Sequence, residues 1–198
     1  RGFEGVISEN EDFTEAKRRR ELLDLLKILD REELRAGRGK LERYQPHEIQ
    51  EAFHKSSARV RLVIGGNRLG KSTLSVIEAC WLALGIHPYH PIPVPNKGKM
   101  YGDSFPTIMD TFVPKFDEWI PSEFLDSKRP YEYNQMGHTI GVNFRNGSII
   151  KIGSYDQEHR KAEGSDWDYI GFDEPPPRSL YVANMRGTID RGGLIWFS

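Results

Sequence analysis

Two glycines, a lysine and a serine occur at a spacing that suits binding of a nucleotide's phosphates. Gly65 is followed after four residues by Gly70, Lys71 and Ser72, in the pattern G-x-x-x-x-G-K-[ST]. Glycines let backbone N–H groups converge on a phosphate, and the N-terminus of a following helix adds partial positive charge. Lys71 would neutralise the β- and γ-phosphates, and Ser72 would offer its hydroxyl to Mg²⁺. The predicted nucleotide-binding loop comprises Gly65, Gly66, Asn67, Arg68, Leu69, Gly70, Lys71, Ser72 and Thr73.

A pair of acids follows an apolar run further along the chain. Asp173 and Glu174 come directly after Tyr-Ile-Gly-Phe, which predicts a buried strand that ends in carboxylates. Asp173 is expected to hold the Mg²⁺ shell as the Walker-B acid, and Glu174 to activate a water for in-line attack on the γ-phosphate. An acid at the water position indicates hydrolysis and argues against a small-molecule kinase, which needs an acceptor pocket instead.

An aromatic residue and an amide precede the phosphate loop, in Tyr44-Gln45-Pro46. A tyrosine ring can stack on adenine, and a glutamine amide can bond to adenine's N6/N7 edge, which would favour ATP over GTP. The same residues also suit the start of a helix with a proline in its first turn. Both interpretations remain open on sequence alone.

Arg68 places a second cation inside the phosphate loop, where Lys71 alone normally suffices. One interpretation makes Arg68 a cis sensor of the γ-phosphate that stabilises charge in the transition state. In the other, Arg68 pairs with a local carboxylate when no nucleotide is bound.

The segments that must position these residues alternate between strands and helices. The Asn146-Gly147 pair predicts a hairpin, and the remaining alternation predicts a largely parallel, doubly wound α/β sheet flanked by helices. Strands are predicted over 59–65, 99–104, 138–144, 148–155, 168–172 and 194–197, and helices over 71–84, 107–119 and 178–186. The strand at 59–65 is β-branched and is expected to be buried.

The chain divides by composition into two parts. Residues 1–40 form a charged segment with an amphipathic helix over 11–36 and a Gly-rich hinge over 36–40, and residues 41–198 form the nucleotide-binding domain. The final residue lies in the apolar run GGLIWFS, so we expect the domain to be cut at its C-terminal end.

Overall composition excludes several other classes. The 198 residues carry a net charge of −1, so no general basic excess indicates nucleic acid. Cys80 is the only cysteine, which excludes disulfide frameworks and thiolate zinc sites, and its apolar context predicts an inert buried thiol. His87 and His90 lack a third ligand nearby and are expected on a loop surface. The charged N-terminus and the lack of a membrane-spanning apolar run predict a cytosolic protein.

Four stretches together resemble the ATPase domain of the large subunit of tailed-bacteriophage terminases, the genome-packaging motors: RYQPHEIQ, VIGGNRLGKST, YIGFDEPP and RGGLIWFS. In that family an adenine-recognising segment precedes an arginine-bearing Walker A. A strand ending in Asp-Glu and a strand leading to a Ser/Thr coupling motif follow. The resemblance covers residues 43–198. It implies an α/β P-loop NTPase fold of the additional-strand, catalytic-glutamate type.

The resemblance also assigns roles. Lys71 and Ser72 hold phosphate and Mg²⁺, Asp173 is the Walker-B acid, Glu174 the catalytic base and Arg68 the Walker-A arginine. Ser198 occupies the start of the coupling motif. The family's arginine before Walker B, thought to act on a neighbouring subunit's nucleotide, falls at Glu163 here. Arg160 and Arg186 are the alternatives for this trans arginine, and an ordinary surface or structural salt bridge is an equal alternative for each.

For the function, the resemblance implies hydrolysis of ATP with Mg²⁺ to drive double-stranded DNA into a procapsid. The implied partners are double-stranded DNA, a portal protein, a small terminase subunit and further copies in a homo-oligomeric ring, with a monomer in isolation left open and no membrane involved. The implied location is the host cytoplasm, at the portal of the assembling virion. The family's endonuclease would lie after Ser198. Two alternatives are a helicase-type DNA-dependent ATPase and an ATP-binding switch or scaffold without motor action.

Overall fold

The computed structural model describes residues 17–25, 40–66, 68–155, 166–189 and 191–198. It separates into two units, Arg1–Arg38 and Gly39–Ser198. In the first unit, residues 17–25 form a helix with exposed leucines, within the helix predicted over 11–36. The predicted hinge lies largely outside the described residues. No described helix is long and apolar enough to cross a membrane.

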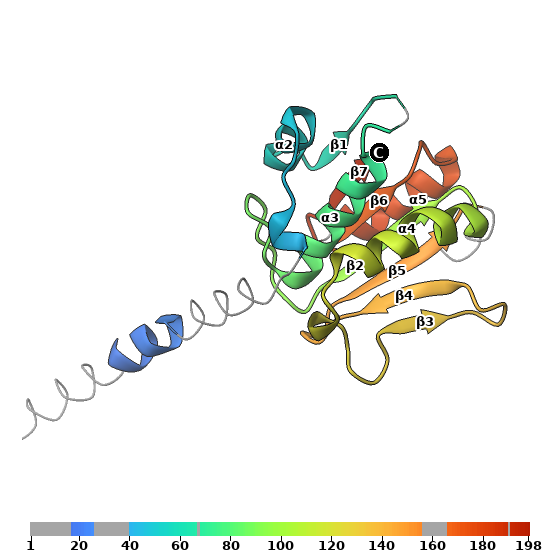
Figure 1. Ribbon diagram of the computed structural model, residues 1–198. Helices are drawn as coiled ribbons and strands as arrows, with labels where there is room; N and C mark the ends of the chain where they lie inside the picture. Colours follow the sequence, from blue (N-terminus) through green and yellow to red (C-terminus); the bar gives the residue numbers. More distant parts are fainter. Residues whose placement is uncertain (1–16, 26–39, 67, 156–165, 190) are drawn as a thin grey trace, which may run out of the picture. The chain divides into compact units, whose positions relative to one another are not determined.

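The second unit is built on one seven-stranded sheet. The strands are Val60–Leu62 (β1), Lys97–Gly102 (β2), Tyr131–Tyr133 (β3), Thr139–Asn143 (β4), Ile149–Ser154 (β5), Tyr169–Phe172 (β6) and Leu194–Phe197 (β7). Their order in the sheet is β1-β7-β6-β2-β5-β4-β3 (Figure 1). The first five strands in this order run parallel to one another, whereas β4 is antiparallel to both β5 and β3. The mainly parallel sheet predicted from the sequence is confirmed.

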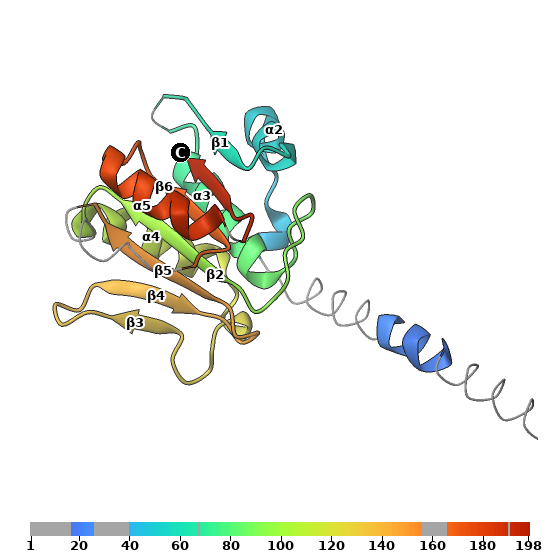
Figure 2. The same cartoon turned by 180° about the vertical axis from the view of Figure 1, so that it is seen from behind.

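Helices cover both faces of this sheet. They are Glu48–Lys55 (α2), Lys71–Leu84 (α3), Phe105–Trp119 (α4) and Arg178–Ile189 (α5), with short 3-10 helices at Leu41–Arg43 and Ser122–Phe124. Figures 1 and 2 show α3 and α4 on one face and α5 on the other. Because both faces are covered, all four residues of β6 are buried.

Local sequence signals explain where several elements begin and end. Helix α3 lies between Gly70 and Gly85, both with φ of 70°, in the left-handed region that glycine favours. Helix α4 begins at Ser104, whose hydroxyl accepts the N–H of Thr107, and Pro106 stands in its first turn, where no N–H is needed. Gly147 turns the predicted hairpin with φ of 86°.

Two strand predictions differ from the structure. The strand predicted over 59–65 is not buried, because β1 is short and lies at the end of the sheet with β7 as its neighbour. Val60 and Leu62 are exposed, and the buried residue between them is Arg61. Strand β3 was not predicted, because its three residues have no periodicity of their own and become a strand only by pairing with β4.

Candidate active site

The phosphate loop connects β1 to α3. Lys71 begins α3, and its Nζ donates a hydrogen bond to the carbonyl of Gly65 at 3.0 Å, which joins the two ends of the loop. Ser72 and Thr73 follow in the first turn of α3 and are half-buried. Asn67 lies outside the described residues. The N-terminus of a 14-residue helix therefore points its free N–H groups into the loop that was predicted to hold phosphates.

Two residues near the predicted site have an unusual backbone. Among the described residues other than glycine, positive φ occurs at Arg68, with φ of 74°, and at Glu174, with φ of 68°. This conformation is strained for a residue with a side chain, and such strain concentrates at functional sites because the surroundings must hold it. The predicted γ-phosphate sensor and the predicted base are therefore both held in this left-handed conformation.

The ends of β6 and β7 hold the pair of acids. The N–H of Ser198 donates to the carbonyl of Phe172 at 3.0 Å, and the N–H of Glu174 donates to the carbonyl of Ser198 at 2.9 Å. Ser198 is buried, and its hydroxyl lies 3.4 Å from the Phe172 carbonyl. The predicted coupling residue is thus bonded directly to the backbone of the predicted base.

The charges of Lys71, Asp173 and Glu174 influence one another. Burial raises the pKa of Asp173, the negative charge of Glu174 raises it further, and the positive charge of Lys71 opposes both effects. No described residue forms a hydrogen bond or an ion pair with the Asp173 carboxylate. The surplus negative charge, together with the oxygen donors Ser72 and Asp173, fits a hard divalent cation such as Mg²⁺.

Arg68 is exposed. Within the described part of the chain, no carboxylate lies within ion-pair distance of its guanidinium, so the predicted local ion pair is not observed. The role of Arg68 as a sensor of the γ-phosphate stays a prediction.

The predicted adenine segment shows a packed tyrosine and an exposed amide. The ring of Tyr44 meets the rings of His54, Trp81 and Trp119 edge-on, with centroids 5.6–5.7 Å away. The Tyr44 hydroxyl lies 3.1 Å from His54 Nε2, and burial raises the pKa of this tyrosine. Gln45 is exposed. Pro46 precedes the N-cap of α2, so it does not stand in the first turn of that helix.

Two residues of α2 and its N-cap reach the phosphate loop and were not predicted. Gln50 is buried, and its Nε2 donates to the carbonyl of Gly70 at 3.3 Å. His47 donates from Nε2 to the carbonyl of Leu69 at 3.1 Å, and its own N–H donates to Gln50 Oε1. The spacing His47-x-x-Gln50 at the start of a helix was the sequence signal that could have identified them.

A buried group of charged side chains lies next to α3, which we call the Glu78 cluster: Arg61, Glu78, His54 and His87. Glu78 Oε2 accepts hydrogen bonds from His54 Nδ1 at 2.6 Å and His87 Nε2 at 2.9 Å. Arg61 Nη2 lies 2.5 Å from Glu78 Oε1, as an ion pair without the alignment of a hydrogen bond. Burial alone would raise the pKa of Glu78, but the two histidine hydrogen bonds and the Arg61 charge lower it well below its ordinary value.

The loop-surface prediction for His87 is therefore wrong. His87 is 3% exposed, and its Nε2 lies 2.9 Å from Glu78 Oε2 in the preceding helix α3. The ligand atoms of His54, Glu78 and His87 lie within 4.8 Å of one another, which would suit a metal ion. However, His87 Nδ1 accepts the backbone N–H groups of Tyr89 and His90, so the proton must be on Nε2, which then has no lone pair for a metal. Arg61 also already compensates the Glu78 charge.

The remaining predicted residues are not brought into the site by described contacts. Arg186 is exposed in the last turn of α5. Arg160 and Glu163 lie outside the described residues. Cys80 is free, and its thiol is buried, as the sequence predicted, and burial raises its pKa.

Comparison with known proteins gives a family and a fold. Residues 62–193 match the family model described as terminase large subunit, T4likevirus-type, N-terminal. No curated protein sequence matches the chain. The chain is similar to the large terminase ATPase domain of Thermus phage P74-26, with 20% identity and a TM-score of 0.54 over 80% of this chain and 66% of that chain. It is also similar to the large terminase of another thermophilic bacteriophage, with 15% identity and a TM-score of 0.59 over 78% of this chain and 39% of that chain.

The matched regions cover only part of the solved structures. At such low identity the solved structures show a shared fold, and this chain spans less than two thirds of either structure. The second of these terminases has also been solved in complex with ADP, with 15% identity and a TM-score of 0.53 over 77% of this chain and 38% of that chain. The family match covers most of the chain and includes the phosphate loop and the Asp-Glu pair. The chain therefore belongs to the family of T4likevirus-type terminase large subunits, as part of their N-terminal region.

Proposed function

We propose that this domain binds ATP with Mg²⁺ and hydrolyses it to drive double-stranded DNA into a procapsid. The observation that carries the proposal is the left-handed backbone of Arg68, inside the phosphate loop, and of Glu174, next to the candidate metal ligand Asp173. Strain of this kind is maintained where geometry matters for the reaction. Membership of the terminase large-subunit family supports ATP as the substrate and double-stranded DNA as the molecule that is moved.

Each side chain of the site would have its own role in ATP hydrolysis. Lys71 and the N–H groups at the start of α3 bind the phosphates. Glu174 accepts a proton from the attacking water, and Arg68 stabilises the charge that develops on the γ-phosphate. Ser198 would transmit the state of the nucleotide through its hydrogen bond to the Glu174 backbone. Tyr44 and Gln45 would recognise adenine. For this, one face of the packed Tyr44 ring must be open to stack on the base.

Ser72 and Asp173 would hold the Mg²⁺ ion. When bound, this ion would neutralise charge on the β- and γ-phosphates. The negative charge of Glu174 raises the pKa of Asp173, and the positive charge of the bound ion would lower it again.

As a packaging motor, the domain would work with further protein partners and with DNA. Copies of the domain would assemble as a ring on a portal protein, with a small terminase subunit recognising the DNA. Arg186 or Arg160 from a neighbouring copy would complete each site. This assembly would act in the host cytoplasm, at the portal of the assembling virion.

The decisive test measures phosphate release from ATP with Mg²⁺, with and without linear double-stranded DNA and portal protein. Turnover that rises when DNA and portal are both present supports the packaging motor. Equal stimulation by single-stranded DNA without portal would indicate the helicase-type alternative. Tight ATP binding without turnover under every condition would indicate a switch or scaffold.

A further inference from the structure

Tyr155 lies directly after β5 and contacts the pair of acids from the neighbouring part of the sheet. Its hydroxyl oxygen is 2.7 Å from the carbonyl oxygen of Asp173 and 2.8 Å from that of Glu174. Both contacts involve backbone oxygens, so Tyr155 leaves the two carboxylates free.

These two carbonyls have a special relation to Glu174. They belong to the peptide groups on either side of its Cα, so their orientations define φ and ψ of this residue. The N–H of the first peptide group donates to the Ser198 carbonyl, and the second is followed by Pro175, which has no N–H. A hydroxyl whose single proton is shared between both carbonyls therefore helps to keep Glu174 in its left-handed conformation.

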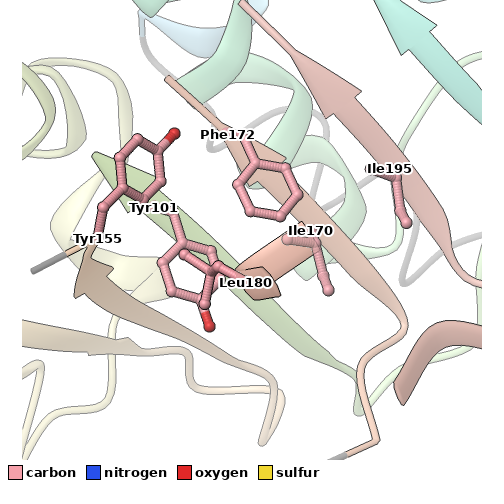
Figure 3. Packing of buried hydrophobic residues seen from close by; sticks show 6 residues of the cluster. All are labelled: Tyr101, Tyr155, Ile170, Phe172, Leu180 and Ile195. Carbon is pink, nitrogen blue, oxygen red and sulfur yellow. The ribbon is translucent and has the colours of Figure 1, made fainter. Parts of the chain in front are cut away.

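The ring of Tyr155 is fixed by its packing. It is 6% exposed and lies in the hydrophobic cluster that faces α5, with ring centroids 6.3 Å from Tyr101 and 6.5 Å from Phe172. Figure 3 shows the hydroxyls of Tyr155 and Tyr101 pointing in opposite directions. The Tyr101 hydroxyl donates to Asn184 Oδ1 at 3.1 Å.

We propose that Tyr155 is a positioning residue that sets the direction of the Glu174 carboxylate through the backbone. This inference rests on the proposed ATP hydrolysis by Glu174. Without the hydroxyl, the Asp173–Glu174 backbone can relax toward an ordinary φ, and the carboxylate moves away from the attacking water. Nucleotide binding depends on the phosphate loop and should change little.

Tyr155→Phe tests the proposal because it removes the hydroxyl and keeps the ring. We expect kcat to fall about 10- to 100-fold, while KM for ATP changes less than about twofold. Tyr101→Phe is the matched control, since it removes a buried, hydrogen-bonded hydroxyl from the same cluster on the side away from Glu174. It should lower the thermal midpoint to a similar extent and keep the wild-type kcat.

A double variant separates positioning from general damage. In a Glu174→Gln background the base is already lost, so Tyr155→Phe should cause no further fall in kcat. Wild-type kcat in Tyr155→Phe, an equal loss in Tyr101→Phe, or a full further loss in the double variant would each overturn the proposal. If the wild-type protein hydrolyses no ATP, the proposed function and this inference are overturned together, which distinguishes that case from the other three.

Discussion

Charged side chains beside the two halves of helix α3 show opposite behaviour. At its first turn, Lys71 and the nearby Asp173 and Glu174 form no ion pairs with described residues, and the backbone of Glu174 is strained. Near its middle, Glu78 is fully buried and joined to an arginine and two histidines. Charge without an ion-pair partner at the edge of a parallel sheet is available for a ligand, whereas charge paired in the interior stabilises the arrangement of the elements around it.

The same contrast explains why residue type alone misleads. The Glu78 cluster has the composition of a metal site, two imidazoles and a carboxylate, but its hydrogen bonds account for the donors and acceptors that a metal would need. The proposed active site has an ordinary serine and aspartate, and its unpaired charge is what suits a metal ion. Substitutions, acid and removal of metal can each test this difference between the two regions.

Glu174→Gln should abolish most turnover and leave ATP binding intact. The amide cannot accept the proton of the attacking water, so we expect kcat to fall about 10²- to 10⁴-fold. Phosphate release and binding of a fluorescent ATP analogue measure the two properties separately. Glu118→Gln, on the exposed end of α4, serves as the control. A wild-type rate in Glu174→Gln would remove Glu174 from the role of base.

Glu78→Gln should affect stability instead of chemistry. The substitution leaves the Arg61 guanidinium buried without its counter-charge, so the free energy of unfolding should fall by about 3–5 kcal/mol. Chemical denaturation measures the change, with the exposed Glu123→Gln as control. The double variant Arg61→Met/Glu78→Gln should recover much of the loss, because it removes both charges and keeps an amide oxygen that can accept a histidine hydrogen bond. An unchanged denaturation midpoint for Glu78→Gln would contradict a structural role.

Arg68→Ala should reduce hydrolysis far more than binding. An arginine that acts on developing charge contributes mainly to the transition state, so we expect about a 10²-fold fall in kcat with little change in ATP affinity. The exposed Arg145→Ala is the control for loss of a surface cation. Equal losses in kcat and in affinity would make Arg68 a binding residue.

Acid should weaken the fold through Glu78. Its pKa is about 4.3 in an unfolded chain and lower in the folded protein, so the unfolded state binds more protons. The stabilisation is therefore complete above about pH 5 and is lost as the pH falls, with a slope of at most about 1.4 kcal/mol per pH unit. Glu78→Gln should show a flatter decline than wild type in denaturation series from about pH 6 to pH 3. Coinciding slopes would show that another group titrates.

Removal of metal from the nucleotide-free protein should have no effect on stability. Because Nε2 of His87 carries a proton, dialysis against EDTA should leave the thermal midpoint of the nucleotide-free protein unchanged. A lower midpoint that Zn²⁺ restores would establish a bound metal in the Glu78 cluster and reverse the distinction between the two regions.

Features that depend on residues close together in the chain could be predicted from the sequence alone. The glycines of the phosphate loop, Pro106 at the start of α4 and the Asn146-Gly147 turn act through local backbone geometry, so their positions could be predicted. The alternation of strands and helices was sufficient for the parallel sheet, because parallel strands need crossover helices.

Features that join segments distant in the chain could be recognised only in the folded structure. The Glu78 cluster combines residues from α2, β1, α3 and the loop after α3, and no short-range pattern links Glu78 to His54 and Arg61. The exposure of β1 depends on its place at the end of the sheet, since an apolar strand is buried only where neighbours cover it. Tyr155 reaches the Glu174 backbone because β5 and β6 both lie beside β2, which brings their carboxyl ends together. Such contacts depend on how the strands are ordered, and short-range patterns carry no information about that order.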